Sequence, residues 1–354
     1  MGEPPANQAA RNSAARGLVE RLRRSGYRED ERGIFRSGQE GYWSNLDKEE
    51  NRRFLESLDR LAPREAIRTS YPQYEGIIFS PKRDAALELL DIKPGETGVD
   101  YGCMWGALSV GMSRRGAAVL AMDQTYESLV FLAHRVKDEG LDDIVLAQSD
   151  IRQAPLEELA DFAVVNGVLE WIPEAGEVEL KKFFGKKAGR AAPRRAPEEM
   201  QLRFLEQVCR NMKAGGRLLL TIENRYDYSQ FIGKRDPHAN LWLTSVLPRP
   251  LANLISQAAL GRPYVNYLYS FPALKNLLLK AGFSRAELYM CFPDYRFPEL
   301  ILPYEGGISG YVPHGPSLAQ ASWRRKAAVA FERMAMRWLK ARFFAPSIAA
   351  VAIR

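Results

Sequence analysis

The sequence has few of the residues that cross-link small folds or bind metals. It contains three cysteines and three histidines among 354 residues. The cysteines form no CxxC pair, which argues against a structural zinc site or a disulfide framework. The histidines are too few and too scattered to suggest a His-rich metal centre, so we expect no metal. These six residues are Cys103, Cys209, Cys291, His134, His238 and His314.

Long apolar runs are also missing. No run of about 18 apolar residues occurs, so no transmembrane helix is expected. Residues 1–17 lack the apolar region of a secretory signal, so we expect a cytoplasmic protein. With 46% apolar and 26% charged residues, the chain is long enough to bury one large core or two modest ones. This composition excludes a disordered chain or a fibre.

The net charge of +7 equals the charge of one insert, because the charges of the rest of the chain sum to zero. Residues 181–195 contain seven basic side chains and no acidic one, within a longer insert over 174–197. The insert is either a solvated loop or a contact with phosphate or anionic lipid. A pI near 9 is weak evidence for nucleic acid when the charge is confined in this way.

From about residue 80, predicted strands alternate with predicted helices. The strands are apolar without a polar alternation, which is typical of a parallel sheet covered on both faces. Residues 1–79 lack this alternation and read as a helical N-terminal extension to a domain over 80–354. The expected strands are 97–101, 117–122, 143–148, 162–166, 217–223, 284–292 and 345–354. The prediction is therefore a doubly wound, seven-stranded, mostly parallel α/β sheet.

The loop after the first predicted strand indicates a nucleoside pocket. It contains Gly102-x-x-x-Gly106 in place of the GxGxxG that would cradle a pyrophosphate. Asp123 ends the second strand, where a carboxylate suits a ribose diol. Asp150-Ile151 follows the third strand and can bracket an adenine. Asn166 ends the fourth strand, where the reacting group of the ligand should lie. S-adenosylmethionine is a ligand of this kind.

On the basis of these residues, the sequence resembles the class I S-adenosylmethionine-dependent methyltransferases over about 80–354. Residues 99–106 match the family's glycine loop, and segments 161–171 and 213–220 match its fourth and fifth strands. The resemblance implies the strand order 3-2-1-4-5-7-6 with an antiparallel last strand. It also implies a cofactor site made of Asp100, Tyr101, Gly102, Cys103, Gly106, Asp123, Gln124, Asp150, Ile151 and Asn166.

The loop departs from the family pattern at one position. Met104 stands where the family has a middle glycine. Three interpretations follow: the backbone tolerates a side chain here and the loop still binds, the thioether packs against the methionyl tail of the cofactor, or binding is impaired.

Two side chains are candidate catalytic residues, because a hydroxyl acceptor benefits from a general base. Glu170 follows the fourth strand and His238 lies in an insertion after the fifth. Alternatively, Glu170 caps or salt-bridges locally, and His238 is an ordinary loop residue. Methyl transfer itself can rely on proximity and alignment, so a missing nucleophile triad is no objection.

Two insertions, 224–270 and 293–344, should overhang the acceptor side of the sheet. Their aromatic and polar residues suit a polyhydroxylated ligand, although most of the rings must form a satellite core. The segments at 223–225 and 293–298 resemble methyltransferases of bacterial surface-glycan and glycolipid assembly. Expected substrate-binding residues are Glu223, Asn224, Tyr226, Asp294 and Tyr295. The expected acceptor is a sugar, glycolipid or related small molecule, methylated on oxygen.

Other partners and functions are alternatives to this interpretation. Base-directed amino methyltransferases carry (D/N/S)PP(Y/F) after the fourth strand, whereas this chain has residues 166–169 as Asn-Gly-Val-Leu, so no nucleic acid is expected. Residues 322–344 form either a basic amphipathic helix for a membrane surface or an ordinary surface helix. The remaining alternatives are a binding protein without catalysis, and a methyltransferase for another small molecule or a lipid at the membrane surface.

Overall fold

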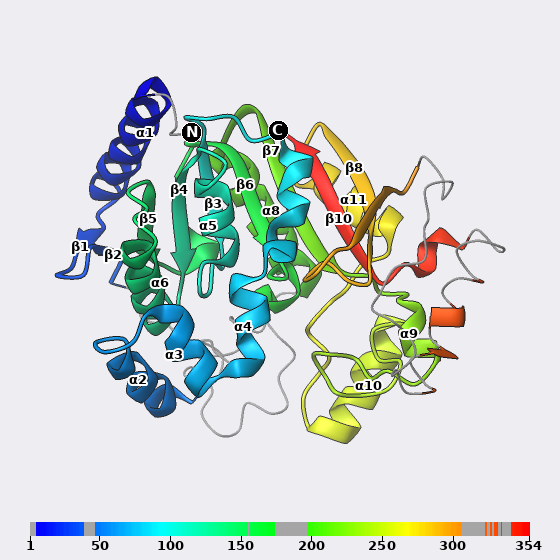
Figure 1. The fold of residues 1–354 in the computed structure, drawn as a ribbon. Coiled ribbons are helices and arrows are strands. Elements are labelled where there is room, and N and C mark those ends of the chain that lie inside the picture. The colour runs from blue at the N-terminus through cyan, green and yellow to red at the C-terminus, as the bar shows by residue number, and fades with distance from the viewer. Residues whose placement is uncertain are drawn as a thin grey trace. The chain divides into compact units, whose positions relative to one another are not determined.

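The computed structural model describes residues 5–38, 47–154, 156–173, 197–305 and 341–354, together with 323, 326, 327, 329–331 and 334. Figure 1 labels its helices and strands. The chain divides into two compact units. The first unit comprises Met1–Asn166, Gln207–Leu219 and Ile353–Arg354. The second unit comprises Gly167–Glu206 and Leu220–Ala352.

The N-terminal extension contains two strands as well as helices. Strands β1 and β2 pair antiparallel, and β2 runs parallel to β5. The prediction of a purely helical extension is corrected here. A strand of three residues, two of them buried, is too short to show an alternating pattern. The elements are α1 (Pro5–Arg24), β1 (Arg28–Glu29), β2 (Ile34–Arg36), α2 (Lys48–Ser57), α3 (Pro63–Ser70), α4 (Pro72–Phe79) and the 3-10 helix η1 (Pro81–Leu90).

Four parallel strands form the centre of the first unit. Val99 of β3 pairs with Leu120 of β4 on one side and with Ala163 of β6 on the other. These strands are buried on both faces, as their unbroken apolar sequences predict. The elements are β3 (Thr97–Tyr101), α5 (Ala107–Ser113), β4 (Ala118–Asp123), α6 (Tyr126–Asp138), β5 (Ile144–Gln148), η2 (Ile151–Gln153) and β6 (Ala160–Asn166).

The remaining elements follow β6 along the chain. They are η3 (Leu169–Trp171), α8 (Pro197–Asn211), β7 (Met212–Glu223), α9 (Tyr228–Phe231), α10 (Arg249–Leu260), α11 (Phe271–Lys280), β8 (Arg285–Phe292), β9 (Leu300–Pro303), η6 (Arg342–Phe344) and β10 (Ser347–Ile353). Backbone hydrogen bonds join Arg354 to Gly216 and Asn224 to Pro346, so β10 runs antiparallel to β7.

The described strands follow the order β1-β2-β5-β4-β3-β6-β7-β10-β8-β9. The order that the family resemblance implies, 3-2-1-4-5-7-6, is contained in it as the run from β5 to β8. The predicted count of seven strands is wrong, because the short strands β1, β2 and β9 extend the sheet at its edges. Edge strands of two to four residues carry too little pattern to be found in a sequence.

Two predictions fall on other parts of the chain. The basic insert over 181–195 and most of segment 322–344 lie outside the described residues. None of the described helices combines the length and the apolar character needed to cross a bilayer.

Candidate active site

The glycine loop of the first unit is a tight turn between β3 and α5. Gly102 and Gly106 have φ of 75° and 73°, in the left-handed region that favours glycine. A Cβ on Gly106 would lie 2.1 Å from Cδ1 of Leu132, so any side chain there would force Leu132 to move. The loop is therefore closed against α6 and can present its backbone to a ligand.

Met104 takes the same left-handed conformation without being glycine. Its φ is 51°, a conformation that costs an L-residue about 1–2 kcal/mol. Its side chain packs against a cluster that includes Phe54, Trp105 and Phe131. The structure thus gives the thioether a place within the first unit, and contact with a cofactor tail stays a prediction.

Asp123 closes the loop from the end of β4. Its Oδ2 accepts a hydrogen bond of 2.8 Å from the Met104 amide, and its Oδ1 accepts one of 2.8 Å from the Thr125 amide. Burial raises the pKa of Asp123 above its usual value, although these amides act in the opposite direction. The Thr125 side chain and the Gln124 amide also act on this carboxylate, so a ribose diol would share it with these groups. The carboxylate and the glycine turn therefore fit an adenosyl ligand.

Several groups predicted to lie near the adenine already have hydrogen-bond partners within the chain. Oδ2 of Asp150 lies 2.6 Å from a terminal nitrogen of Arg152, and Oδ1 accepts from the Arg152 amide. An adenine amine would share this carboxylate with the guanidinium. The carbonyl of Ile151 accepts a hydrogen bond from Gln207, and that of Gln124 accepts one from Gln148. Asn166, the last residue of β6, is partly exposed.

Three of the predicted cofactor residues are buried in the first unit. Oδ2 of Asp100 accepts a hydrogen bond of 2.6 Å from Ser109, and burial raises the pKa of Asp100 to about 6. The Tyr101 hydroxyl accepts a hydrogen bond from Asn211. The amide of Cys103 donates to the carbonyl of Met122. These residues hold the loop in place, and their contacts with a cofactor stay predictions.

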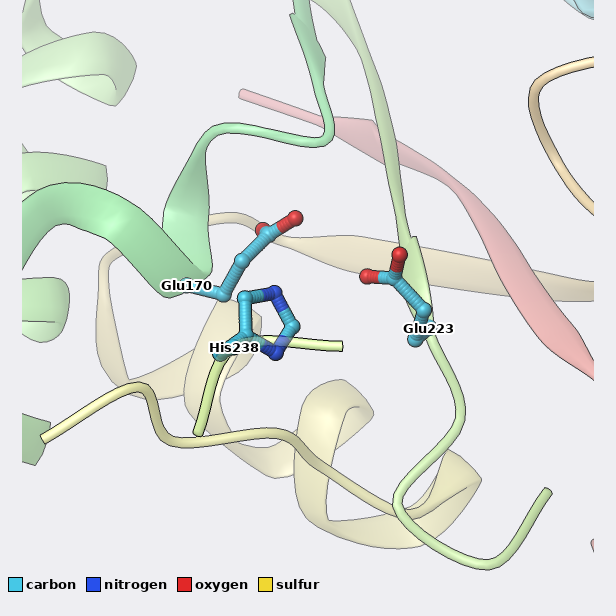
Figure 2. A group of neighbouring side chains, drawn as sticks. All are labelled: Glu170, Glu223 and His238. Atoms are coloured by element: carbon cyan, nitrogen blue, oxygen red, sulfur yellow. The ribbon is translucent and has the colours of Figure 1, made fainter. Parts of the chain in front are cut away.

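A second group of polar side chains gathers within the second unit. Glu170, Glu223 and His238 each offer a ligand atom, and these atoms all lie within 4.8 Å of one another. Figure 2 shows the three side chains meeting from the turn after β6, the end of β7 and the loop beyond. The three residues are predicted separately from the sequence but their grouping is not, because Glu223 lies 53 positions after Glu170 and His238 lies 15 positions after Glu223.

Glu170 is held in the turn η3 by buried amides. Its carbonyl accepts a hydrogen bond from Asn266, and the carbonyl of Leu169 accepts one from Gln201. The hydroxyl of Tyr269 donates to Gln201 at 2.6 Å and fixes that amide. Glu170 is 1% exposed, and neither of its carboxylate oxygens has a hydrogen-bond partner among the described residues. The local cap or salt bridge considered for Glu170 is therefore absent from the described structure.

Glu223 reaches the cluster from the last position of β7. Its Oε1 accepts a hydrogen bond of 3.3 Å from Tyr295, while its buried Oε2 has no partner in the described part of the chain. Gly167 makes room for Tyr295, because a Cβ there would lie 2.4 Å from the tyrosine hydroxyl. Burial and then the Glu223 carboxylate raise the pKa of Glu170 well above its usual value.

His238 is positioned by a turn that Asp236 organises. Oδ1 of Asp236 accepts from the amides of His238 and Ala239, and Oδ2 accepts from the Tyr264 hydroxyl. The imidazole contacts Trp171 edge to face with ring centroids 4.8 Å apart. Its Nδ1 lies 3.7 Å from Oδ1 of Asp236, beyond hydrogen-bond distance, and has no described partner.

The other predicted substrate residues differ in the contacts that they make within the chain. The Asn224 amide nitrogen donates to the carbonyls of Phe343 and Ala345 at 2.6 and 2.7 Å, so this buried side chain anchors the end of β7. Asp294 accepts from the amides two and three residues on and closes its own turn. Tyr226 is partly exposed beside the guanidinium of Arg225. Their roles toward a substrate stay predictions.

Comparison with known proteins gives one family match. Residues 99–184 match the model of a family described as a methyltransferase domain. This segment is therefore similar to a methyltransferase domain. It spans the glycine loop, Asp123, Asp150 and Glu170. A search of curated proteins gives no match.

Solved methyltransferase structures resemble the chain at low identity. One is phosphoethanolamine N-methyltransferase 2 of Haemonchus contortus with S-adenosyl-L-methionine, at 16% identity and a TM-score of 0.45. The match covers 88% of this chain and 61% of that enzyme, so the chain spans about three-fifths of its length. Another is a SAM-dependent methyltransferase of Aquifex aeolicus, at 18% identity and a TM-score of 0.39, covering 65% of this chain and 93% of that one.

Proposed function

We propose that the protein transfers the methyl group of S-adenosylmethionine to a hydroxyl oxygen of a sugar, glycolipid or related polar metabolite. The observation that carries this proposal is the buried cluster of Glu170, Glu223 and His238. A hydroxyl must lose its proton as its oxygen is methylated, and this cluster offers groups that can bind the hydroxyl and take the proton.

The first unit supplies the residues for the cofactor. Gly102 and Gly106 shape the loop, and Asp123 lies beside it at the end of β4, where the family resemblance implies a ribose acid. When bound, S-adenosylmethionine supplies a sulfonium methyl group that is displaced in line. The contribution of the chain is to align the acceptor oxygen and to exclude water, which can account for much of such a rate enhancement.

The aromatic residues of the insertion give little support for a polyhydroxylated acceptor. Tyr264 and Tyr267 are buried in a small core with Ala239 and Ala252. They therefore form the satellite core that was the alternative interpretation. Tyr295 stays beside the cluster through Glu223. A hydroxylated acceptor is supported by the cluster and by the resemblance of segments 223–225 and 293–298 to glycan-assembly methyltransferases.

Contact with an anionic membrane surface belongs to the same proposal, for a lipid-linked acceptor. Three large apolar side chains at the end of α9 and in the segment after it, Phe231, Ile232 and Trp242, are 45%, 44% and 61% exposed. Lys234 and Arg235 are exposed between them. An apolar tip with basic neighbours suits an interface of this kind. Flotation with vesicles of acidic phospholipid should recover the protein at low salt, and Trp242→Ala should reduce the recovery; no flotation would contradict the contact.

The experiment for the activity has two steps. Calorimetry should show that S-adenosylmethionine and its demethylated product both bind. Incubation of the protein with methyl-labelled cofactor and a fractionated cell extract should then place the label in an acid-stable ether of a polar product. Label found only on nitrogen would overturn the choice of oxygen. Binding without any transfer would favour a binding protein that keeps the methyltransferase fold.

A further inference from the structure

The cluster in the second unit leaves buried polar atoms without partners. Both oxygens of Glu170, Oε2 of Glu223 and Nδ1 of His238 lack hydrogen-bond partners among the described residues. Burying even one such group costs about 1–3 kcal/mol, and more when the group is charged. Nearly all buried polar atoms in proteins have a partner. Nδ1 of His238 lies 3.7 Å from Oδ1 of Asp236, but the three carboxylate oxygens of Glu170 and Glu223 have no such neighbour and indicate that a ligand completes the cluster.

The donor spacing fits a single cation. Bond lengths of about 2.1 Å let two donors on one ion lie up to about 4.2 Å apart. The three donors lie within 4.8 Å of one another, so small side-chain rotations bring them to one centre. Two carboxylates and a neutral imidazole together carry a charge of −2, which a divalent ion balances.

The donor types narrow the choice of ion. Imidazole suits transition metals such as Zn²⁺, whereas Mg²⁺ and Ca²⁺ prefer oxygen ligands alone. Carboxylates suit Mn²⁺ and are also common ligands of Zn²⁺. A set of two carboxylates and one imidazole therefore favours a divalent transition ion over Mg²⁺.

We propose that Glu170, Glu223 and His238 bind one divalent transition-metal ion, of the Mn²⁺ or Zn²⁺ class. The surrounding residues already hold these ligands in place. Tyr295 donates to Glu223, and Asp236 fixes the turn that carries His238. Outer contacts of this kind are typical of metal sites, where they orient the ligands.

The proposed ion gives the acceptor a binding point, and this part rests on the proposed function. Three protein donors leave coordination positions for one or two hydroxyl oxygens of the acceptor. Coordination to a divalent ion lowers the pKa of a bound hydroxyl or water. The hydroxyl proton would then leave to solvent or to a nearby base as the methyl group is transferred.

A shared proton between the two glutamates is the competing explanation. A proton between Glu170 and Glu223 would satisfy one oxygen of each, but it would not involve His238. The two explanations therefore differ in whether the imidazole takes part. Substitution of His238 should abolish metal binding, whereas it should leave a shared proton intact.

The test is Mn²⁺ binding to the full chain after treatment with a chelator. Titration followed by electron paramagnetic resonance should show one bound Mn²⁺ per chain. His238→Ala and Glu170→Gln should each weaken the affinity on the order of tenfold or more. The matched controls His134→Ala and Glu305→Gln, which lie outside the cluster, should bind as the unchanged protein does. No bound Mn²⁺ or Zn²⁺, or equal affinity in all variants, would overturn the site.

A measurement on the unchanged protein covers the case in which a variant fails to fold. Electron spin echo spectra of bound Mn²⁺ should show coupling to one imidazole nitrogen, and absence of that coupling would overturn the ligand set. Metal binding and methyl transfer are scored separately. Transfer without metal binding would reject this inference and keep the proposed function, and metal binding without transfer to any acceptor would do the reverse.

Discussion

The acidic side chains of the two units differ in their hydrogen-bond partners. In the first unit, Asp123 and Asp150 accept hydrogen bonds from nearby amides, and Asp150 also pairs with Arg152. In the second unit, Glu170 and Glu223 keep buried oxygens without described partners. The first set shapes a loop that is complete without a ligand. In the proposed metal site, a bound ion completes the second set.

Substitutions in the two units should therefore have different effects. Substitutions in the first unit should change the shape of the loop, and with it stability and cofactor affinity. Substitutions in the cluster should change what the second unit binds while costing little stability, because no described hydrogen bond of the Glu170 carboxylate is lost.

The largest effect is expected from Gly106→Ala. The new Cβ would meet Leu132 at 2.1 Å and sit at a positive φ, so we expect a loss of about 3–5 kcal/mol in unfolding free energy. The matched control is Gly140→Ala, which has a similar φ of 64° but open space around it. That control should lose only about 1 kcal/mol. Urea unfolding measures both, and equal losses would show that the contact with Leu132 is unimportant.

The next effect concerns the pH dependence of stability through Asp100. Its folded pKa of about 6 exceeds the usual value of 3.8, so the folded state binds the proton more tightly than the unfolded state. Stability should therefore fall as pH rises from about 4 to about 6, by on the order of 3 kcal/mol, and then level off.

The variant Asp100→Asn removes this titration and should flatten the profile. Unfolding free energies of both proteins at pH 4.5 and 7.5 give the comparison. If the difference between the two pH values is the same in the variant, burial of Asp100 does not set this part of the profile.

Gly167→Ala tests the position of Tyr295 in the second unit. A Cβ would lie 2.4 Å from the Tyr295 hydroxyl at a φ of 65°, so Tyr295 must move away from Glu223. We expect a loss of about 1–3 kcal/mol in stability and weaker acceptor binding, with unchanged affinity for the cofactor. Unfolding and calorimetry measure the two quantities, and a change in cofactor affinity alone would contradict the assignment.

The smallest effect is expected from Met104→Gly. Glycine relieves a φ of 51°, which favours folding by about 1 kcal/mol, but it removes packing against Phe54 and Trp105. The net change in stability should lie within about 1 kcal/mol. Cofactor affinity separates the interpretations: an increase indicates that the thioether impairs binding, and a decrease indicates that it contacts the ligand.

The sequence predicted the parts of the structure that local pattern determines. The central strands, the glycine turn and the position of Asp123 follow from contiguous apolar runs and a short motif. The antiparallel direction of β10 followed from the family resemblance. Strands β1, β2 and β9 were missed because two to four residues show no period.

The cluster in the second unit could be predicted only in part. Glu170 and His238 were found as single candidates, but their proximity depends on a turn organised by Asp236 and on the end of β7. One signal was available in the sequence: Asp236-Pro237-His238 has an aspartate two residues before the histidine, a spacing typical of a turn that the aspartate closes. The absence of partners around Glu170 depends on the packing and cannot be read from the sequence.

The most direct test of the account is calorimetric titration of S-adenosylmethionine into three proteins: the unchanged chain, Asp123→Ala and Glu170→Gln. The account predicts binding to the unchanged chain and to Glu170→Gln, with affinity for Asp123→Ala lower on the order of 100-fold, as expected when a charged hydrogen-bond acceptor is lost. A chain that does not bind the cofactor, or that binds it equally well without the Asp123 carboxylate, would contradict it.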